Sequence, residues 1–179
     1  MKEGIFRLWK GLGKTVFIML IIPWTIEIGF AQAQPKEATE SITTSWYVTT
    51  KVVPLGEDRI YVTYEAIGVT VTDTGEGLFH GATARALGGM IIEKGFYNDE
   101  LGYGVWNLQN GDKVFMTYKF AGKAGTGGIA KGSFTITGGT GKCAGIQGGS
   151  EESTRTMVRT ALEGVGQSFS KSKVRYKLP

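Results

Sequence analysis

Residues 59–73 read RIYVTYEAIGVTVTD, and apolar side chains recur at every second position in the first half of this stretch. One face carries only apolar side chains, namely those of Ile60, Val62, Tyr64 and Ala66. A period of two predicts a β-strand with one buried face. After Gly68 the pattern shifts by one residue and brings Val69 and Val71 onto the apolar face, so we expect a bulge or a sharp bend at Gly68.

The same alternation recurs along the chain, and turn signals separate the segments that show it. KVFMTYKF at 113–120 is the clearest second example. Further strand candidates are SWYVTTKVV, GMIIEKGF, YGVWNL, AKGSFTIT and SKSKVRYKL. Turns are expected at 54–58, 73–77, 98–102, 110–111 and 138–141. Short strands with turns every eight to twelve residues or so predict an all-β sandwich or barrel.

Glycine usage favours the barrel over the sandwich. Of the 28 glycines, 24 follow Ala33, and several interrupt strand patterns instead of separating them. Closing a small barrel needs bends and close backbone approaches, which glycine inside a strand allows. We therefore predict an antiparallel barrel of about eight strands over residues 43–179, preceded by a flexible lead at 34–42.

The first 33 residues have the layout of a secretory signal peptide. Basic residues between 2 and 14 precede an apolar run of ten residues at 15–24, and Ala31-Gln32-Ala33 matches a cleavage site of small residues. The run is about half of the ~20 residues that a membrane-spanning helix needs. We expect cleavage before Gln34 and export to the periplasm or the extracellular space, with membrane contact only through the leader. An uncleaved anchor is the alternative.

The charge balance gives no reason to expect a nucleic-acid partner. The chain has a net charge of +4, but the leader holds four of its 20 basic and two of its 16 acidic residues, which leaves +2 after cleavage. Nucleic-acid-binding domains usually carry a strong basic excess. Cys143 is the only cysteine, so an intrachain disulfide is excluded and the fold depends on its core.

The glycine-rich stretch TITGGTGKCAGIQGG at 135–149 fails as a phosphate-binding loop. The G-x-x-x-x-G-K-[ST] pattern requires glycine at 136 and Ser or Thr at 143, where the chain has Ile136 and Cys143. No amphipathic helix follows whose N-terminus could receive an anion. We therefore expect no nucleotide, no metal and no cofactor, and interpret the stretch as a tight connection between strands with glycines at positive φ.

Within it, GGTGKCAGIQG at 138–148 resembles the G-G-[ST]-G-[KR]-[FY]-x-G-x-x-G turn of small β-barrels of the allene oxide cyclase and dirigent type, with Cys143 where an aromatic residue is usual. The order of EAIGVTVTDTGEGLFHGAT, YNDELGYGVWNLQNGDKVFMTYK and KSKVRYKLP also resembles uncharacterised exported bacterial proteins with such a barrel. The resemblance implies the barrel fold and leaves open a homo-oligomer. No catalytic set of the plant cyclases or the dirigent proteins matches position by position.

Large side chains at strand positions are the candidates for a ligand cavity. They are Trp46, Tyr64, Trp106, Met116 and Tyr118. In GATARALGG, three alanines at 82, 84 and 86 share one face, and they would leave room in a lumen if that face pointed inward. This composition suits a small apolar ligand such as a fatty acid derivative or a phenolic.

Four ionisable residues are candidates for polar chemistry in the same cavity. His80 is the only histidine, so a triad or a histidine base would have to use it, and a histidine-rich metal site is excluded. Glu65 and Glu93 fall inside strand patterns, where a lumen-facing carboxylate could act as an acid or base, although the position of Glu65 favours solvent. An inward Arg85 would need an acidic partner such as Glu65 or Glu93.

Three functions stay open at this point. The favoured one is an exported barrel that binds a small apolar molecule in its lumen. The first alternative is a cofactor-free cyclase or isomerase, which requires Glu65, Glu93 or Arg85 to line the cavity. The second is a solidly packed barrel that serves the cell envelope through structure or protein interaction. An enzyme is disfavoured because no nucleophile, base and orienting group cluster in the sequence.

Overall fold

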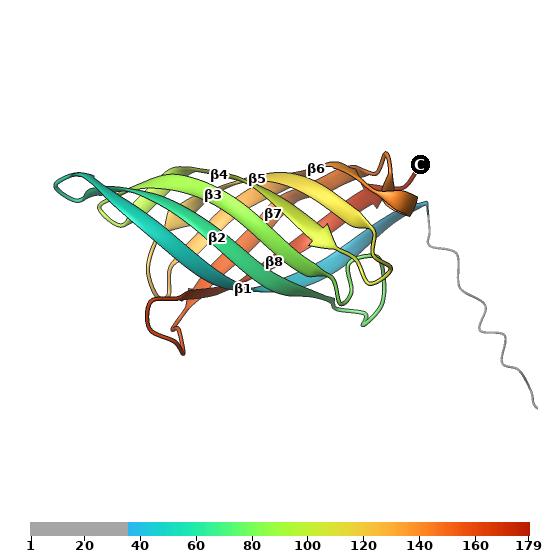
Figure 1. The fold of residues 1–179 in the computed structure, drawn as a ribbon, viewed down its shortest axis with the longest axis horizontal. Coiled ribbons are helices and arrows are strands. Elements are labelled where there is room, and N and C mark those ends of the chain that lie inside the picture. The colour runs from blue at the N-terminus through green and yellow to red at the C-terminus, as the bar shows by residue number, and fades with distance from the viewer. Residues whose placement is uncertain (1–35) are drawn as a thin grey trace, which may run out of the picture. The chain divides into compact units, whose positions relative to one another are not determined.

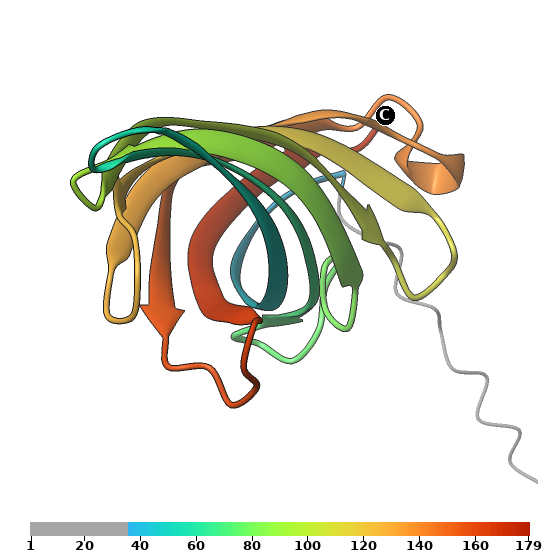
Figure 2. The same ribbon diagram turned by 60° about the vertical axis from the view of Figure 1, so that its left-hand side comes forward.

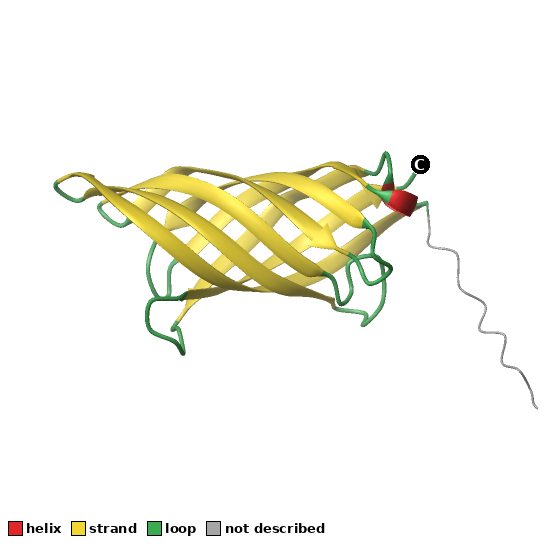
Figure 3. Ribbon diagram, in the orientation of Figure 1, coloured by secondary structure: helices red, strands yellow, loops and turns green. Residues whose placement is uncertain are grey.

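A computed structural model describes residues 36–179, and the expected signal peptide lies outside the described residues. Eight strands pair antiparallel in chain order, and β1 also pairs with β8, which closes the barrel (Figure 1). The strands are β1 (Glu37–Gly56), β2 (Arg59–Thr72), β3 (Thr83–Glu93), β4 (Phe96–Asn107), β5 (Lys113–Lys123), β6 (Ile129–Gly139), β7 (Gln147–Val158) and β8 (Gly166–Lys177). The described part holds one short 3-10 helix, Gly141–Cys143, so the predicted all-β barrel is confirmed (Figure 3).

Strand β1 begins earlier than the sequence pattern indicated. Residues 37–42, which we had placed in a flexible lead, pair with residues 172–177 of β8. Their backbone groups make the ladder although most of their side chains are polar, because ladder hydrogen bonds do not depend on side-chain type. The barrel therefore extends to Glu37.

Strand β2 keeps one phase along its whole length, which corrects the expectation of a bulge at Gly68. The register with β1 and with β3 runs through Gly68 without a shift. Thr70 is buried, whereas Val69 and Val71 are exposed on the outer face. Thr70 occupies an inward position because its hydroxyl has buried partners, Thr44 Oγ1 at 2.8 Å and the indole nitrogen of Trp106 at 3.1 Å.

Two turns also differ from the sequence-based expectation. Lys94 and Gly95 both have positive φ and join β3 to β4, whereas residues 98–102, expected to form a turn, lie within β4. At the predicted type I′ turn, Gly111 has positive φ but Asn110 does not. The glycine-rich connection between β6 and β7 is confirmed, with Gly141 and Gly145 at positive φ.

One end of the barrel is plugged by side chains, and we call it the closed end. The loop between β2 and β3 inserts Phe79, whose ring centroid lies 4.9 Å from that of Trp106 and 5.7 Å from that of Tyr176. The carboxylate of Glu40 holds this loop, because it accepts hydrogen bonds from the backbone N–H groups of residues 78 and 79 at 2.8 and 3.2 Å and from the Tyr176 hydroxyl at 2.7 Å.

The opposite end carries the four hairpins β1–β2, β3–β4, β5–β6 and β7–β8, and we call it the mouth. Figure 2, turned toward these hairpins, shows the strands curving around the lumen. Among the described residues, no helix has the length and apolar character that a membrane crossing requires.

Candidate functional site

A cavity of about 310 Å³ occupies the lumen between the plug and the mouth. It reaches the mouth because Thr126 of the β5–β6 hairpin and Thr160 of the β7–β8 hairpin contribute to its wall. The structure brings five of the sequence candidates together in this wall: Trp46, Tyr64, Trp106, Met116 and Tyr118. Ala86 also lines it, so the alanine face of β3 points inward. The volume lies at the lower end of the range for small-molecule sites.

The four ionisable candidates do not line the cavity. Arg85 and Glu65 form an ion pair of 2.7 Å on the outer surface, where their side chains are 59% and 42% exposed. The alternation of β2 explains this placement, because Tyr64 points inward and its neighbour must point outward. Glu93 is exposed beside the β3–β4 turn. His80 lies in the β2–β3 loop at the closed end, with Nδ1 3.1 Å from the Thr72 hydroxyl.

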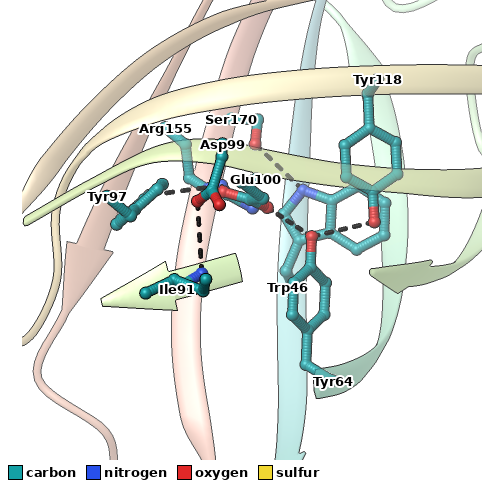
Figure 4. A network of polar contacts seen from close by, with 9 residues as sticks. All are labelled: Trp46, Tyr64, Ile91, Tyr97, Asp99, Glu100, Tyr118, Arg155 and Ser170. Carbon is teal, nitrogen blue, oxygen red and sulfur yellow. Dashed lines mark hydrogen bonds and ion pairs between the residues drawn. The ribbon is translucent and has the colours of Figure 1, made fainter. Parts of the chain in front are cut away.

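A different glutamate and arginine meet inside the barrel. Glu100 of β4 is fully buried and forms an ion pair with Arg155 of β7, a strand that is not a neighbour of β4 in the sheet (Figure 4). Its second oxygen accepts a hydrogen bond from Tyr64, and Arg155 Nη2 lies 3.4 Å from the Tyr97 hydroxyl. The pair with its phenols therefore bridges the interior from β2 to β7.

A β-bulge assembles part of this network. Tyr97 pairs with Gly122 of β5 but Glu100 pairs with Phe120, so β4 has one extra residue between them. Residues three apart in a regular strand face opposite sides. The extra residue reverses this relation and places both Tyr97 and Glu100 on the buried side.

A pair of glycines makes room for the phenols. Gly88 of β3 and Gly102 of β4 are partners in the ladder and place no side chain on the inner face. A methyl group on Gly88 would lie 2.6 Å from the Tyr64 hydroxyl oxygen, and one on Gly102 would overlap the Tyr118 hydroxyl. The backbone of β3 and β4 therefore accommodates two hydroxyl groups that any larger residue would displace.

The protonation of the network follows from its geometry. A phenol hydroxyl group has one hydrogen to donate, and a carboxylate can only accept, so Tyr64 donates to Glu100. The Tyr118 hydroxyl group, whose oxygen lies 2.9 Å from that of Tyr64, therefore donates to it. Burial and the nearby Glu100 carboxylate raise the pKa of Tyr64, and burial raises the pKa of Tyr118 to about 12. Burial is the largest single effect on Arg155 and acts to lower its pKa, but the charge of Glu100, the nearby phenols and the hydrogen bond to Glu100 together raise it more, so the net shift is upward. At neutral pH the phenols are protonated and Arg155 is charged.

Arg155 has hydrogen-bond capacity that the protein does not use. Among the described residues only its Nη2 atom makes hydrogen bonds, and its buried Nε has no acceptor. The guanidinium carbon lies 4.4 Å from the centre of the Phe120 ring, and the side chain, 12% exposed, lines the cavity. The arrangement offers a bound molecule charged N–H donors in apolar surroundings.

Sequence reasoning missed Glu100 and Arg155 for identifiable reasons. Residues 98–102 read as a turn, and QGGSEESTRTMV at 147–158 lacks the alternation that marks a strand, so β7 was not recognised. One signal was present in the sequence. Glu100 lies an even number of residues from Gly102, Gly104 and Trp106, so a β4 strand that begins at Phe96 places its carboxylate on the same, inward face.

The sequence matches no protein-family model and no curated protein. Within residues 36–179, no three histidine, cysteine or acidic side chains gather where they could hold a metal ion.

Proposed function

We propose that this protein binds a small, mainly apolar molecule in the lumen of its barrel. The observation that carries the proposal is the cavity of about 310 Å³, plugged at one end, reaching the mouth at the other and lined by Trp46, Met116 and Tyr118 among other apolar groups. Concave, largely apolar sites with a few polar groups are typical of small-molecule binding.

The cavity weighs against a barrel used only for structure. Protein interiors pack densely and hold few voids larger than a water molecule. A void of this size lowers the stability of a small domain unless a ligand occupies it. A small-molecule role accounts for a cavity of this volume, whereas a purely structural role does not.

A cofactor-free cyclase or isomerase is the second candidate, and the Tyr64–Glu100 contact beside the cavity is the observation in its favour. General acid–base catalysis works best when the pKa of the catalytic group lies near the working pH. The strongly raised pKa of Tyr64 makes this phenol a hydrogen-bond donor that retains its proton. The network therefore supports binding better than proton transfer.

We also infer export to the periplasm or the extracellular space, from the predicted leader at 1–33. The likeness to exported barrels of the allene oxide cyclase and dirigent type belongs to the same proposal, and a closed eight-stranded barrel is compatible with it. The mass of the protein recovered from its host would test the leader, because cleavage before Gln34 fixes the expected value.

The binding test uses N-phenylnaphthylamine, a neutral probe whose fluorescence rises in apolar surroundings. We expect saturable binding to the wild-type protein. Ala86→Phe fills the lumen from β3 and should abolish binding, whereas Leu87→Phe, at the next, outward-facing position, should leave it unchanged. Equal binding by both variants would place the probe outside the lumen, and no saturable binding to the wild type would overturn the proposal.

A further inference from the structure

We propose that the bound molecule is uncharged and carries an oxygen acceptor, such as a ketone, ester or amide carbonyl, that receives hydrogen bonds from Arg155. This inference rests on the proposed function and assigns the chemical class of the ligand. It follows from the charge balance of the cavity and from the unused donors of its one arginine.

The charge balance of the cavity disfavours a charged ligand. Among the described residues that line the cavity, Arg155 is the only formally charged one, and the others have apolar, aromatic, hydroxyl or amide side chains or are glycines. Glu100, buried behind it, already compensates that charge. A carboxylate ligand would bring a second negative charge into a site where residues 36–179 supply no further cation, and burying an uncompensated charge is costly.

An ammonium ligand fits no better. It would face the Arg155 guanidinium across the cavity, while Glu100 has no exposed surface to offer and both its oxygens are engaged by Tyr64 and Arg155. A neutral molecule avoids both penalties.

The unused donors require an acceptor. A guanidinium has five N–H groups, and Arg155 bonds only through Nη2 among the described residues. Its Nε is buried, so Nη1 is the unused donor group that a molecule in the cavity can reach. A carbonyl oxygen supplies acceptor lone pairs without adding charge, and hydrogen bonds from charged donors are stronger than those between neutral groups. The molecule that completes this site therefore has one polar oxygen and an otherwise apolar body.

The hydroxyl groups elsewhere in the wall do not compete for this role, because the protein already pairs most of them. Ser170 accepts a hydrogen bond from the Trp46 indole at 3.1 Å, and Ser153 and Ser172 bond each other at 2.7 Å. Among the described residues of the wall, Arg155 is thus the charged group with unused donors that a ligand can meet.

Displacement of N-phenylnaphthylamine by three eight-carbon molecules tests the inference. The molecules are 2-octanone, octanoate and n-octane, measured at pH 7, where octanoate is ionised. We expect 2-octanone to bind about tenfold or more tightly than n-octane and at least about tenfold more tightly than octanoate. Octanoate binding as tightly as 2-octanone would overturn the inference, and so would equal binding of 2-octanone and n-octane.

A charge variant gives a second, independent reading. Glu100→Gln keeps the shape of the side chain but leaves the charge of Arg155 uncompensated, so the preference should reverse in favour of octanoate. Glu65→Gln, in the exposed ion pair, is the matched control and should keep the wild-type order. An unchanged order in Glu100→Gln would contradict the charge argument, and if that variant fails to fold, the wild-type order alone decides.

The two proposals fail in different ways. If the probe does not bind, or binds equally to Ala86→Phe, the lumen is not a ligand site and the proposed function is wrong. If the probe binds in the lumen and all three eight-carbon molecules displace it equally, the lumen site stands and only the assignment of a neutral carbonyl ligand is wrong.

Discussion

The barrel contains two glutamate–arginine pairs in opposite surroundings. Glu65 and Arg85 join β2 to β3 on the outer face, where water reaches both side chains. Glu100 and Arg155 join β4 to β7 through the interior, where Glu100 has no exposed surface. The same two residue types therefore form a solvated surface contact in one place and the polar centre of the proposed ligand cavity in the other.

The difference shows how burial changes the energetic contribution of an ion pair. Exposed pairs contribute little because water and salt screen them. A buried pair need not stabilise the fold compared with apolar residues, but removing one partner is costly because the other charge remains buried. A buried pair beside a cavity, with Arg155 donors that no described residue uses, therefore supports the proposed recognition of a ligand better than a role in stability.

Breaking the buried pair should have the largest effect. We expect Arg155→Ala to lower the free energy of unfolding by about 3 to 5 kcal/mol, because it leaves Glu100 without its counter-charge. Urea unfolding followed by tryptophan fluorescence measures this loss. A change below about 1 kcal/mol, the size expected for an exposed pair, would mean that Glu100 is neutral or hydrated and that the comparison does not hold.

Alkaline pH should weaken the interior through its phenols. The pKa of Tyr118 is raised to about 12 from an unfolded value of about 10, so its contribution to stability is complete below pH 10 and is lost as the pH rises toward 12. The loss attributable to Tyr118 is roughly 3 kcal/mol. Unfolding measured from pH 8 to 12 should show a smaller decline in Tyr118→Phe than in the wild type. Parallel declines would mean that Tyr118 is hydrated.

Adding a side chain to the glycine pair Gly88–Gly102 should disturb the same network from the backbone of β3 and β4. Gly102→Ala places a methyl group against the Tyr118 hydroxyl, and we expect a loss of about 1 to 3 kcal/mol in unfolding free energy. Gly166→Ala, whose added methyl would meet its nearest atom at 3.4 Å, is the control and should change stability by about 0.5 kcal/mol or less. Adding Tyr118→Phe to Gly102→Ala should recover part of the lost stability, because it removes the hydroxyl group that the new methyl group meets. If nothing is recovered, the loss in Gly102→Ala does not come from the Tyr118 hydroxyl.

Breaking the exposed pair should have the smallest effect. We expect Arg85→Ala to change the free energy of unfolding by less than about 1 kcal/mol, and a double-mutant cycle with Glu65→Gln to give a coupling of the same size or less. The coupling should fall further in high salt. A coupling as large as that of the buried pair would erase the contrast between the two.

The sequence predicted the barrel because alternation and turn chemistry are local. The residues that share the apolar face of β2 up to Ala66, Tyr64 among them, were predicted correctly and are largely buried, since a period of two fixes which side chains share a face. The alternation predicted the wrong face where a polar residue points inward. Thr70 is buried because it makes hydrogen bonds that only the assembled barrel supplies, and its polarity led to the wrong prediction of a bulge at Gly68.

The buried pair could not be derived in the same way. Glu100 and Arg155 are 55 residues apart, and their strands are not neighbours, so no local pattern connects them. The bulge in β4 and the polar strand β7 hide both residues from an analysis of alternation. The exposed residues Glu65 and Arg85 were easier to find because they lie in clean strand patterns, which is also why they face solvent.

The most direct test of ligand binding is native mass spectrometry of the protein exported by its own host, compared with the mass after denaturation. The proposal predicts excess mass in the native spectrum that disappears on denaturation and that is missing from Ala86→Phe. The identity of the released molecule would then show whether it is neutral and carries a carbonyl oxygen. Equal native and denatured masses, together with no saturable uptake of N-phenylnaphthylamine, would contradict the account.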